Sequence, residues 1–106
     1  METLHSIESI DAFIKEKGFS MIYYSTESCN VCKALFPKLK QLLQSYPKIR
    51  LARVDIGELT EVAGAFSIFT IPCILAYMED KEIIREARYI SMDLLEEKIS
   101  RYYSFL

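Results

Sequence analysis

Two cysteines separated by two residues constrain this 106-residue chain more than any other feature of its sequence. Cys29 and Cys32 stand between a short apolar run, Met21 to Tyr24, and an amphipathic run, Ala34 to Leu43. The first run is typical of a buried strand and the second of a helix, so we expect both thiols on the helix's first turn. The free N–H groups and partial positive charge of a helix N-terminus favour a thiolate over a thiol. The sequence therefore predicts a reactive thiol at this junction.

The spacing of the two thiols also indicates a chemistry. A thiolate is the nucleophile of disulfide exchange, and in a C-x-x-C motif at such a position its pKa falls from about 8.5 into a range of roughly 3.5 to 7.5. One sulfur forms a mixed disulfide with the substrate, and the second displaces the product. Cys29 and Cys32 are therefore candidate catalytic residues. The plainer interpretations are two inert core cysteines or a structural bridge, but the strand-to-helix junction favours redox chemistry.

Length, charge and cysteine usage exclude several other classes of protein. The chain is short enough that residues 1–106 predict one domain. A formal net charge of -2 lacks the basic excess of a nucleic-acid binder. No apolar run approaches the roughly 18 residues of a membrane span, and the N-terminus has no secretory signal pattern. Three cysteines is an odd count, unlike the disulfide framework of a secreted domain. We therefore expect a cytoplasmic monomer that binds neither nucleic acid nor membrane.

Hydrophobic periodicity predicts alternating strands and helices. The expected strands cover residues 2–5, 19–24, 51–56, 74–78 and 82–87, and the expected helices cover residues 7–17, 30–44 and 59–66 and a last helix capped by Ser91. The polar link at residues 79–81 is too short for a parallel crossover, so the last two strands should form an antiparallel hairpin. This order predicts an α/β domain with a mixed four- to five-stranded sheet and helices on both faces.

At this level of detail the chain resembles the thioredoxin family over nearly its whole length. The segment Tyr24 to Lys33 resembles the family's strand end, redox loop and helix start, and Pro37 falls where the family has a proline inside this helix. Arg53 to Asp55 resembles the strand that ends in Val-Asp, and Thr70 to Pro72 resembles the segment before the cis-proline. The resemblance implies a thioredoxin fold.

The resemblance also implies roles for individual residues. Cys29 would be the exposed attacking thiol and Cys32 the buried resolving thiol. Pro72 would be cis, and the backbone of Ile71 would pair with a bound substrate chain. The implied activity is that of a thiol-disulfide oxidoreductase acting on disulfide-bearing proteins. A reductase or a low-molecular-weight thiol would regenerate it, with no cofactor and no metal of its own.

Several positions depart from the family pattern, and the family's signature W-C-G-P-C reads S-C-N-V-C at residues 28–32. Ser28 precedes the motif in place of the family's tryptophan, and the chain contains no tryptophan. Tyr23 stands where thioredoxins bury an aspartate that assists proton transfer to the resolving thiol, so that help must come from water, from Glu27 or from nothing. Arg88 replaces a glycine near the last helix and changes the surface that meets partners. These departures motivate an alternative hypothesis, a thioredoxin-fold binding module with little redox turnover.

The third cysteine, Cys73, follows Pro72 and has two interpretations. A free cysteine at the start of a strand is usually a small buried hydrophobe. With Pro72 near the thiols, however, Cys73 would be a third redox thiol, or a ligand of zinc or an iron-sulfur cluster together with Cys29 and Cys32. The sequence shows no evident fourth ligand for such a site.

Overall fold

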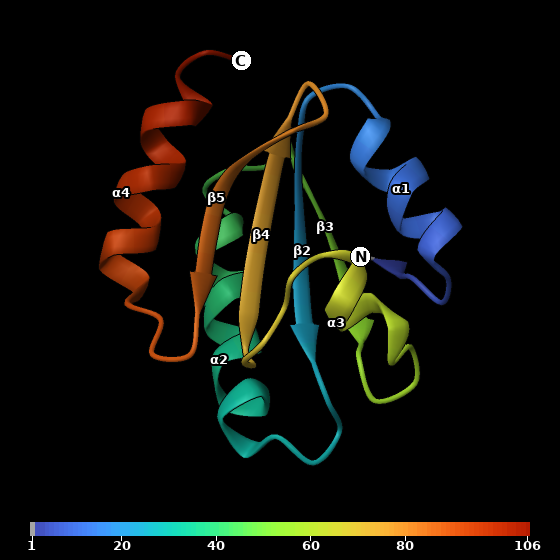
Figure 1. Cartoon of the computed structure of the whole chain (residues 1–106). Coiled ribbons are helices and arrows are strands. Elements are labelled where there is room, and N and C mark those ends of the chain that lie inside the picture. Colours follow the sequence, from blue (N-terminus) through green and yellow to red (C-terminus); the bar gives the residue numbers. More distant parts are fainter. Residues whose placement is uncertain (1) are drawn as a thin grey trace.

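The computed structural model describes residues 2–106, which form a five-stranded sheet with helices on both faces (Figure 1). In chain order the elements are β1 (Glu2–Thr3), α1 (Ile7–Lys15), β2 (Phe19–Ser25), α2 (Asn30–Leu43), β3 (Ile49–Asp55), α3 (Glu61–Ala65), β4 (Cys73–Met78), β5 (Lys81–Ala87) and α4 (Met92–Tyr103). In this part of the chain no helix is long and apolar enough to cross a membrane.

Strand β2 lies at the centre of the sheet, whose order is β1-β3-β2-β4-β5. It pairs parallel with β3 on one side and antiparallel with β4 on the other. The register places Tyr24 near the end of β2 opposite Cys73 at the start of β4, and Cys73 opposite Ala87 at the end of β5. Three connections therefore meet at one end of the sheet: the loop after β2, the loop before β4 and the turn after β5 (Figure 1).

The core is divided by the sheet into two parts. Side chains alternate along β2, so that Met21 and Tyr23 pack on the α2 and α4 face, whereas Ile22 and Tyr24 pack on the α1 and α3 face. Residues Phe19 to Tyr24 are all buried, as expected for a strand covered on both faces. Figure 1 shows α4 to the left of the sheet, α2 behind β4 and β5, and α1 and α3 towards the right.

The predicted helix starts are confirmed by their caps. Ser6 accepts a hydrogen bond from the N–H of Ser9, and Ser91 accepts one from the N–H of Leu94. The predicted antiparallel hairpin is also confirmed, with Glu79 at φ 52° in its turn.

Besides α1, which ends at Lys15 instead of residue 17, two elements are shorter than the sequence pattern predicts. Strand β1 covers only Glu2 and Thr3; the Leu4 N–H still donates to the carbonyl of Arg53 in β3, but the Leu4 side chain packs into the core and the chain then turns to the Ser6 cap. Helix α3 covers five residues instead of eight, and the chain leaves helical geometry at Phe66, whose φ is -115°. None of these differences changes the layers or the strand order.

Candidate active site

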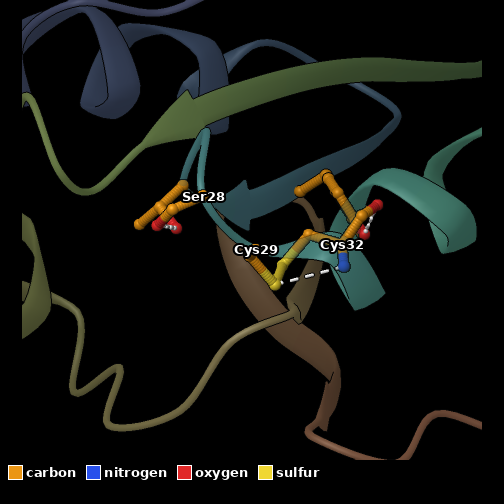
Figure 2. The surroundings of a disulfide bond; sticks show 5 residues. Ser28, Cys29 and Cys32 are labelled. Carbon is orange, nitrogen blue, oxygen red and sulfur yellow. Dashed lines mark hydrogen bonds between the residues drawn. A yellow bond between two sulfur atoms is a disulfide. The ribbon is translucent and has the colours of Figure 1, made fainter.

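Cys29 and Cys32 lie together at the N-terminus of α2 and are joined by a disulfide (Figure 2). Their Cα atoms are 5.2 Å apart. Cys29 is the N-cap residue, and its Sγ accepts a hydrogen bond from the backbone N–H of Cys32 at 3.1 Å. A sulfur at the N-cap therefore takes the place that Ser or Asp oxygen often occupies, against the positive end of the helix. In the reduced protein the same N–H would stabilise a thiolate at Cys29.

The two cysteines differ in their access to solvent. Cys29 is partly exposed, whereas Cys32 is only 2% exposed and packs in the core between the sheet and α2. A bulky substrate disulfide can therefore approach Cys29 and not Cys32. This arrangement gives the pair an outer sulfur for attack and an inner sulfur for ring closure.

Tyr23 anchors the first turn of α2 from the sheet. Its hydroxyl donates a hydrogen bond to the carbonyl oxygen of Cys32 at 2.7 Å, and its ring lies 5.0 Å from that of Phe36. Burial raises the pKa of Tyr23 to about 12, so the hydroxyl stays protonated at neutral pH. Tyr23 therefore holds the turn as a donor and cannot act as the base that an aspartate would supply.

A cavity of about 560 Å³ lies beside this turn. Cys32 and Tyr23 line it, and Cys29 does not. Charged side chains of both signs share its wall: Lys33, Arg53, Glu27, Asp55 and Glu58. A polar cavity of this size has room for several waters. It therefore offers a route by which water, or the Glu27 carboxylate, can exchange protons with the resolving thiol.

The segment before β4 lies at the same end of the sheet as the redox pair. The Ile71–Pro72 peptide bond is cis. The Ile71 side chain packs against the same core cluster as Cys29 and Cys32. Within residues 2–106 the backbone of Ile71 makes no hydrogen bond to another backbone group, whereas the carbonyl of Pro72 accepts one from the N–H of Arg88 at 2.9 Å. The Ile71 peptide groups are thus free to pair with an added chain.

Cys73 is not brought to the redox pair. It is 1% exposed and packs in the core on the α1 and α3 face, whereas Cys32 packs on the opposite face of the sheet. Burial raises the pKa of its thiol to about 11, so at neutral pH it is protonated and a poor nucleophile. This placement fits the buried-hydrophobe interpretation. It does not support a third redox thiol or a metal site that combines Cys73 with Cys29 and Cys32.

Comparison with known proteins gives the same result as the geometry. The family profile described as Thioredoxin matches residues 3–101. The thioredoxin-like protein YdfQ of Bacillus subtilis is 43% identical over 103 residues, covering 97% of this chain and 92% of the relative. The chain belongs to the thioredoxin family. Thioredoxin of Chlamydia trachomatis is 29% identical over 85 residues, covering 80% of this chain and 83% of that one.

Solved thioredoxin structures share the fold. Thioredoxin of Plasmodium falciparum superposes with a TM-score of 0.85 at 20% identity, covering 96% of this chain and 99% of the other. Oxidised mitochondrial thioredoxin 3 of Saccharomyces cerevisiae gives 0.84 at 22% identity, covering 95% and 94%. The thioredoxin fold is thus confirmed. Family membership together with the adjacent Cys29 and Cys32 makes the protein a thiol-disulfide oxidoreductase.

Two features of this thioredoxin-family site could not be found by sequence reasoning. The hydrogen bond from Tyr23 to Cys32 joins residues on different elements, and a tyrosine in an apolar run gives no sign of where its hydroxyl points. The hydrogen bond from the Arg88 N–H to the Pro72 carbonyl likewise depends on the register in which β5 pairs with β4. The one available signal at position 88 was that the thioredoxin family has a glycine there, because glycine is the residue that most readily adopts a positive φ.

Proposed function

We propose that this protein reduces disulfides in protein substrates, with Cys29 as the attacking thiol and Cys32 as the resolving thiol. The observation that carries the assignment is the asymmetry of the pair. Cys29 is partly exposed with its Sγ on a helix N-terminal amide, while Cys32 is buried one turn behind it. The order of attack follows from access, because only the outer sulfur can meet a sulfur atom held by another protein.

The reaction moves two electrons to the substrate. The Cys29 thiolate attacks one sulfur of the substrate disulfide, forming a mixed disulfide, and the departing substrate thiolate takes a proton from solvent. Cys32 then loses its proton to water or Glu27 in the adjoining cavity and attacks the Cys29 Sγ. The second substrate thiol leaves, and the Cys29–Cys32 disulfide remains. A reductase or a low-molecular-weight thiol returns the pair to the dithiol.

The proposal assigns substrate binding to Ile71 and Pro72. The unpaired peptide groups of Ile71 support pairing with an extended substrate chain, which would align its cysteine with Cys29. We further propose that the protein works as a monomer in the cytoplasm. The supports for that location are the unpaired, buried Cys73 and the need of the cycle for a reducing compartment.

Insulin reduction with dithiothreitol tests the cycle. We expect wild-type protein to accelerate precipitation of insulin and Cys29→Ser to fall to the uncatalysed rate. Cys73→Ser is the matched control, since it also removes one thiol, and it should keep wild-type turnover.

A trapping experiment then tests the order of attack. Cys32→Ser should accumulate a mixed disulfide between Cys29 and a disulfide-bearing substrate, visible by mass spectrometry, because the resolving sulfur is gone. Equal insulin reduction by wild type and Cys29→Ser would contradict the proposal and favour a binding module. Trapping through Cys32 in Cys29→Ser would reverse the two roles.

A further inference from the structure

Arg88 adopts a backbone conformation that residues other than glycine rarely adopt. Its φ is 70°, in the left-handed region where a Cβ is unfavourable and glycine is the usual residue. Strained positions of this kind persist where the surroundings hold them, and they cluster at ligand-binding sites. Here the holding contact is the hydrogen bond from the Arg88 N–H to the carbonyl of Pro72 at 2.9 Å. An arginine is thus held in an unfavourable backbone conformation on the turn after β5, next to the cis-proline segment.

The sheet places this arginine at the end that carries the disulfide. Arg88 directly follows β5, whose last residue, Ala87, lies opposite Cys73 at the start of β4. Ile90, two residues farther on, packs in the same core cluster as Cys29 and Ile71. Figure 1 shows the end of β5, the start of β4 and the N-terminus of α2 at the same lower edge of the molecule.

Arg88 is a free charge on this surface. Arg50, Arg85 and Arg101 each pair with a glutamate, whereas across residues 2–106 no carboxylate lies within 4.0 Å of the Arg88 guanidinium. The neighbouring Glu86 is already paired with Lys98. The guanidinium lies 5.9 Å from the ring centroid of Tyr89, which is 91% exposed. An exposed cation with no carboxylate partner among residues 2–106 and an exposed ring therefore lie at the end of the sheet that carries the disulfide.

We propose that Arg88 and Tyr89 select protein substrates whose reacting cysteine is flanked by an acidic residue. The substrate carboxylate pairs with the Arg88 guanidinium, and an adjacent apolar side chain packs on the Tyr89 ring. The partner's acidic charge follows from complementarity with Arg88, a cation that has no carboxylate partner among residues 2–106. This inference rests on the proposed function and adds a substrate class to it.

Three disulfide-bonded peptides that differ only in Glu, Gln or Lys beside the reacting cysteine test the selection. We expect kcat/KM to fall in the order Glu, Gln, Lys, with Glu favoured over Gln by about two- to fivefold, the size of an exposed ion pair. The preference should shrink in high salt because the pair is exposed.

Variants then locate the source of the preference. Arg88→Asn removes the charge and keeps a residue that tolerates positive φ, so it should fold and reduce all three peptides at similar rates. Arg88→Lys should keep most of the preference. Lys81→Gln, at the opposite end of β5, is the control and should leave the order unchanged.

The outcomes separate this inference from the proposed function. A wild type that reduces the three peptides equally, or an Arg88→Asn variant that keeps the full preference, overturns the assignment and leaves the reductase activity standing. A wild type that reduces none of the peptides and no insulin overturns both.

Discussion

The two faces of the sheet hold cysteines in opposite chemical situations. On the α2 and α4 side, Cys29 caps a helix and its Sγ accepts a backbone N–H at 3.1 Å. On the α1 and α3 side, Cys73 is a strand residue, 1% exposed, whose thiol pKa burial raises to about 11. The register of β2 with β4 nevertheless pairs Cys73 with Tyr24. The residue before it, Tyr23, is the one whose hydroxyl is hydrogen-bonded to Cys32. The reactivity of a thiol in this protein therefore depends on the face of the sheet that it occupies, and register alone, which brings Cys73 opposite Tyr24, does not make it reactive.

The two tyrosines repeat the contrast. Tyr23 reaches the redox turn, and its hydroxyl donates a hydrogen bond to the backbone carbonyl oxygen of Cys32. The Tyr24 hydroxyl, on the other face, is buried, and within the described residues it has no hydrogen-bond partner. On the redox face the Tyr23 hydroxyl holds the first turn of α2, whereas on the opposite face the buried Ser20 hydroxyl is bound to the Phe13 carbonyl and the Tyr24 hydroxyl is left without a partner among residues 2–106. Both cases show that a buried polar group has a directed role only where a partner from another element meets it.

The largest expected difference between the faces is in thiol alkylation. In reduced, folded protein at neutral pH, Cys29 should react with iodoacetamide at least about a thousandfold faster than Cys73, because alkylation needs an exposed thiolate. Mass spectrometry of Cys73→Ala, and of the double variant Cys29→Ala with Cys32→Ala, measures each rate separately. Similar rates in the two proteins would show that the faces do not differ as described.

The next effect is a loss of stability at high pH. Burial raises the pKa of Cys73 from 9.0 to about 11, so the folded state holds its proton where the unfolded state has lost it. The resulting stability is fully present below about pH 9 and is lost as the pH rises towards about 11, with a maximum of roughly 3 kcal/mol.

Urea unfolding of the oxidised protein across this pH range measures the loss. In that form Cys29 and Cys32 form the disulfide and do not titrate, so Cys73 is the thiol that responds. Cys73→Ala is the comparison, and its stability should decline less steeply with pH. Parallel slopes for the two proteins would contradict a raised pKa at Cys73.

The smallest effect separates the two tyrosines. Tyr23→Phe removes the hydrogen bond to Cys32 and should lower the free energy of unfolding by about 1 kcal/mol. Tyr24→Phe removes a buried hydroxyl that has no hydrogen-bond partner among residues 2–106, so it should leave stability unchanged or raise it by up to about 1 kcal/mol. Chemical denaturation of both variants tests the pair. A greater loss in Tyr24→Phe than in Tyr23→Phe would invert the comparison.

Much of the fold and site follows from short-range pattern. The apolar run at residues 19–24 predicts a strand buried on both faces, and the caps at Ser6 and Ser91 mark helix starts, because both signals lie within one turn or one strand. The lengths of β1 and α3 were predicted less well. The core packing of Leu4 follows the end of β1, and α3 begins at Glu61 and ends at Ala65, where Phe66 at φ -115° leaves helical geometry; a window of sequence contains neither cause.

The sequence by itself determined the element order and the position of Cys29 and Cys32 at a strand-to-helix junction, because hydrophobic period and motif spacing are local properties. Only the tertiary structure decided which face Cys73 occupies, where the Tyr23 hydroxyl is bound and how Arg88 is held beside Pro72. Each of these depends on contacts between elements distant in the chain. The register of β2 with β4 and of β4 with β5 fixes those contacts, and one residue of slip would move every side chain to the other face.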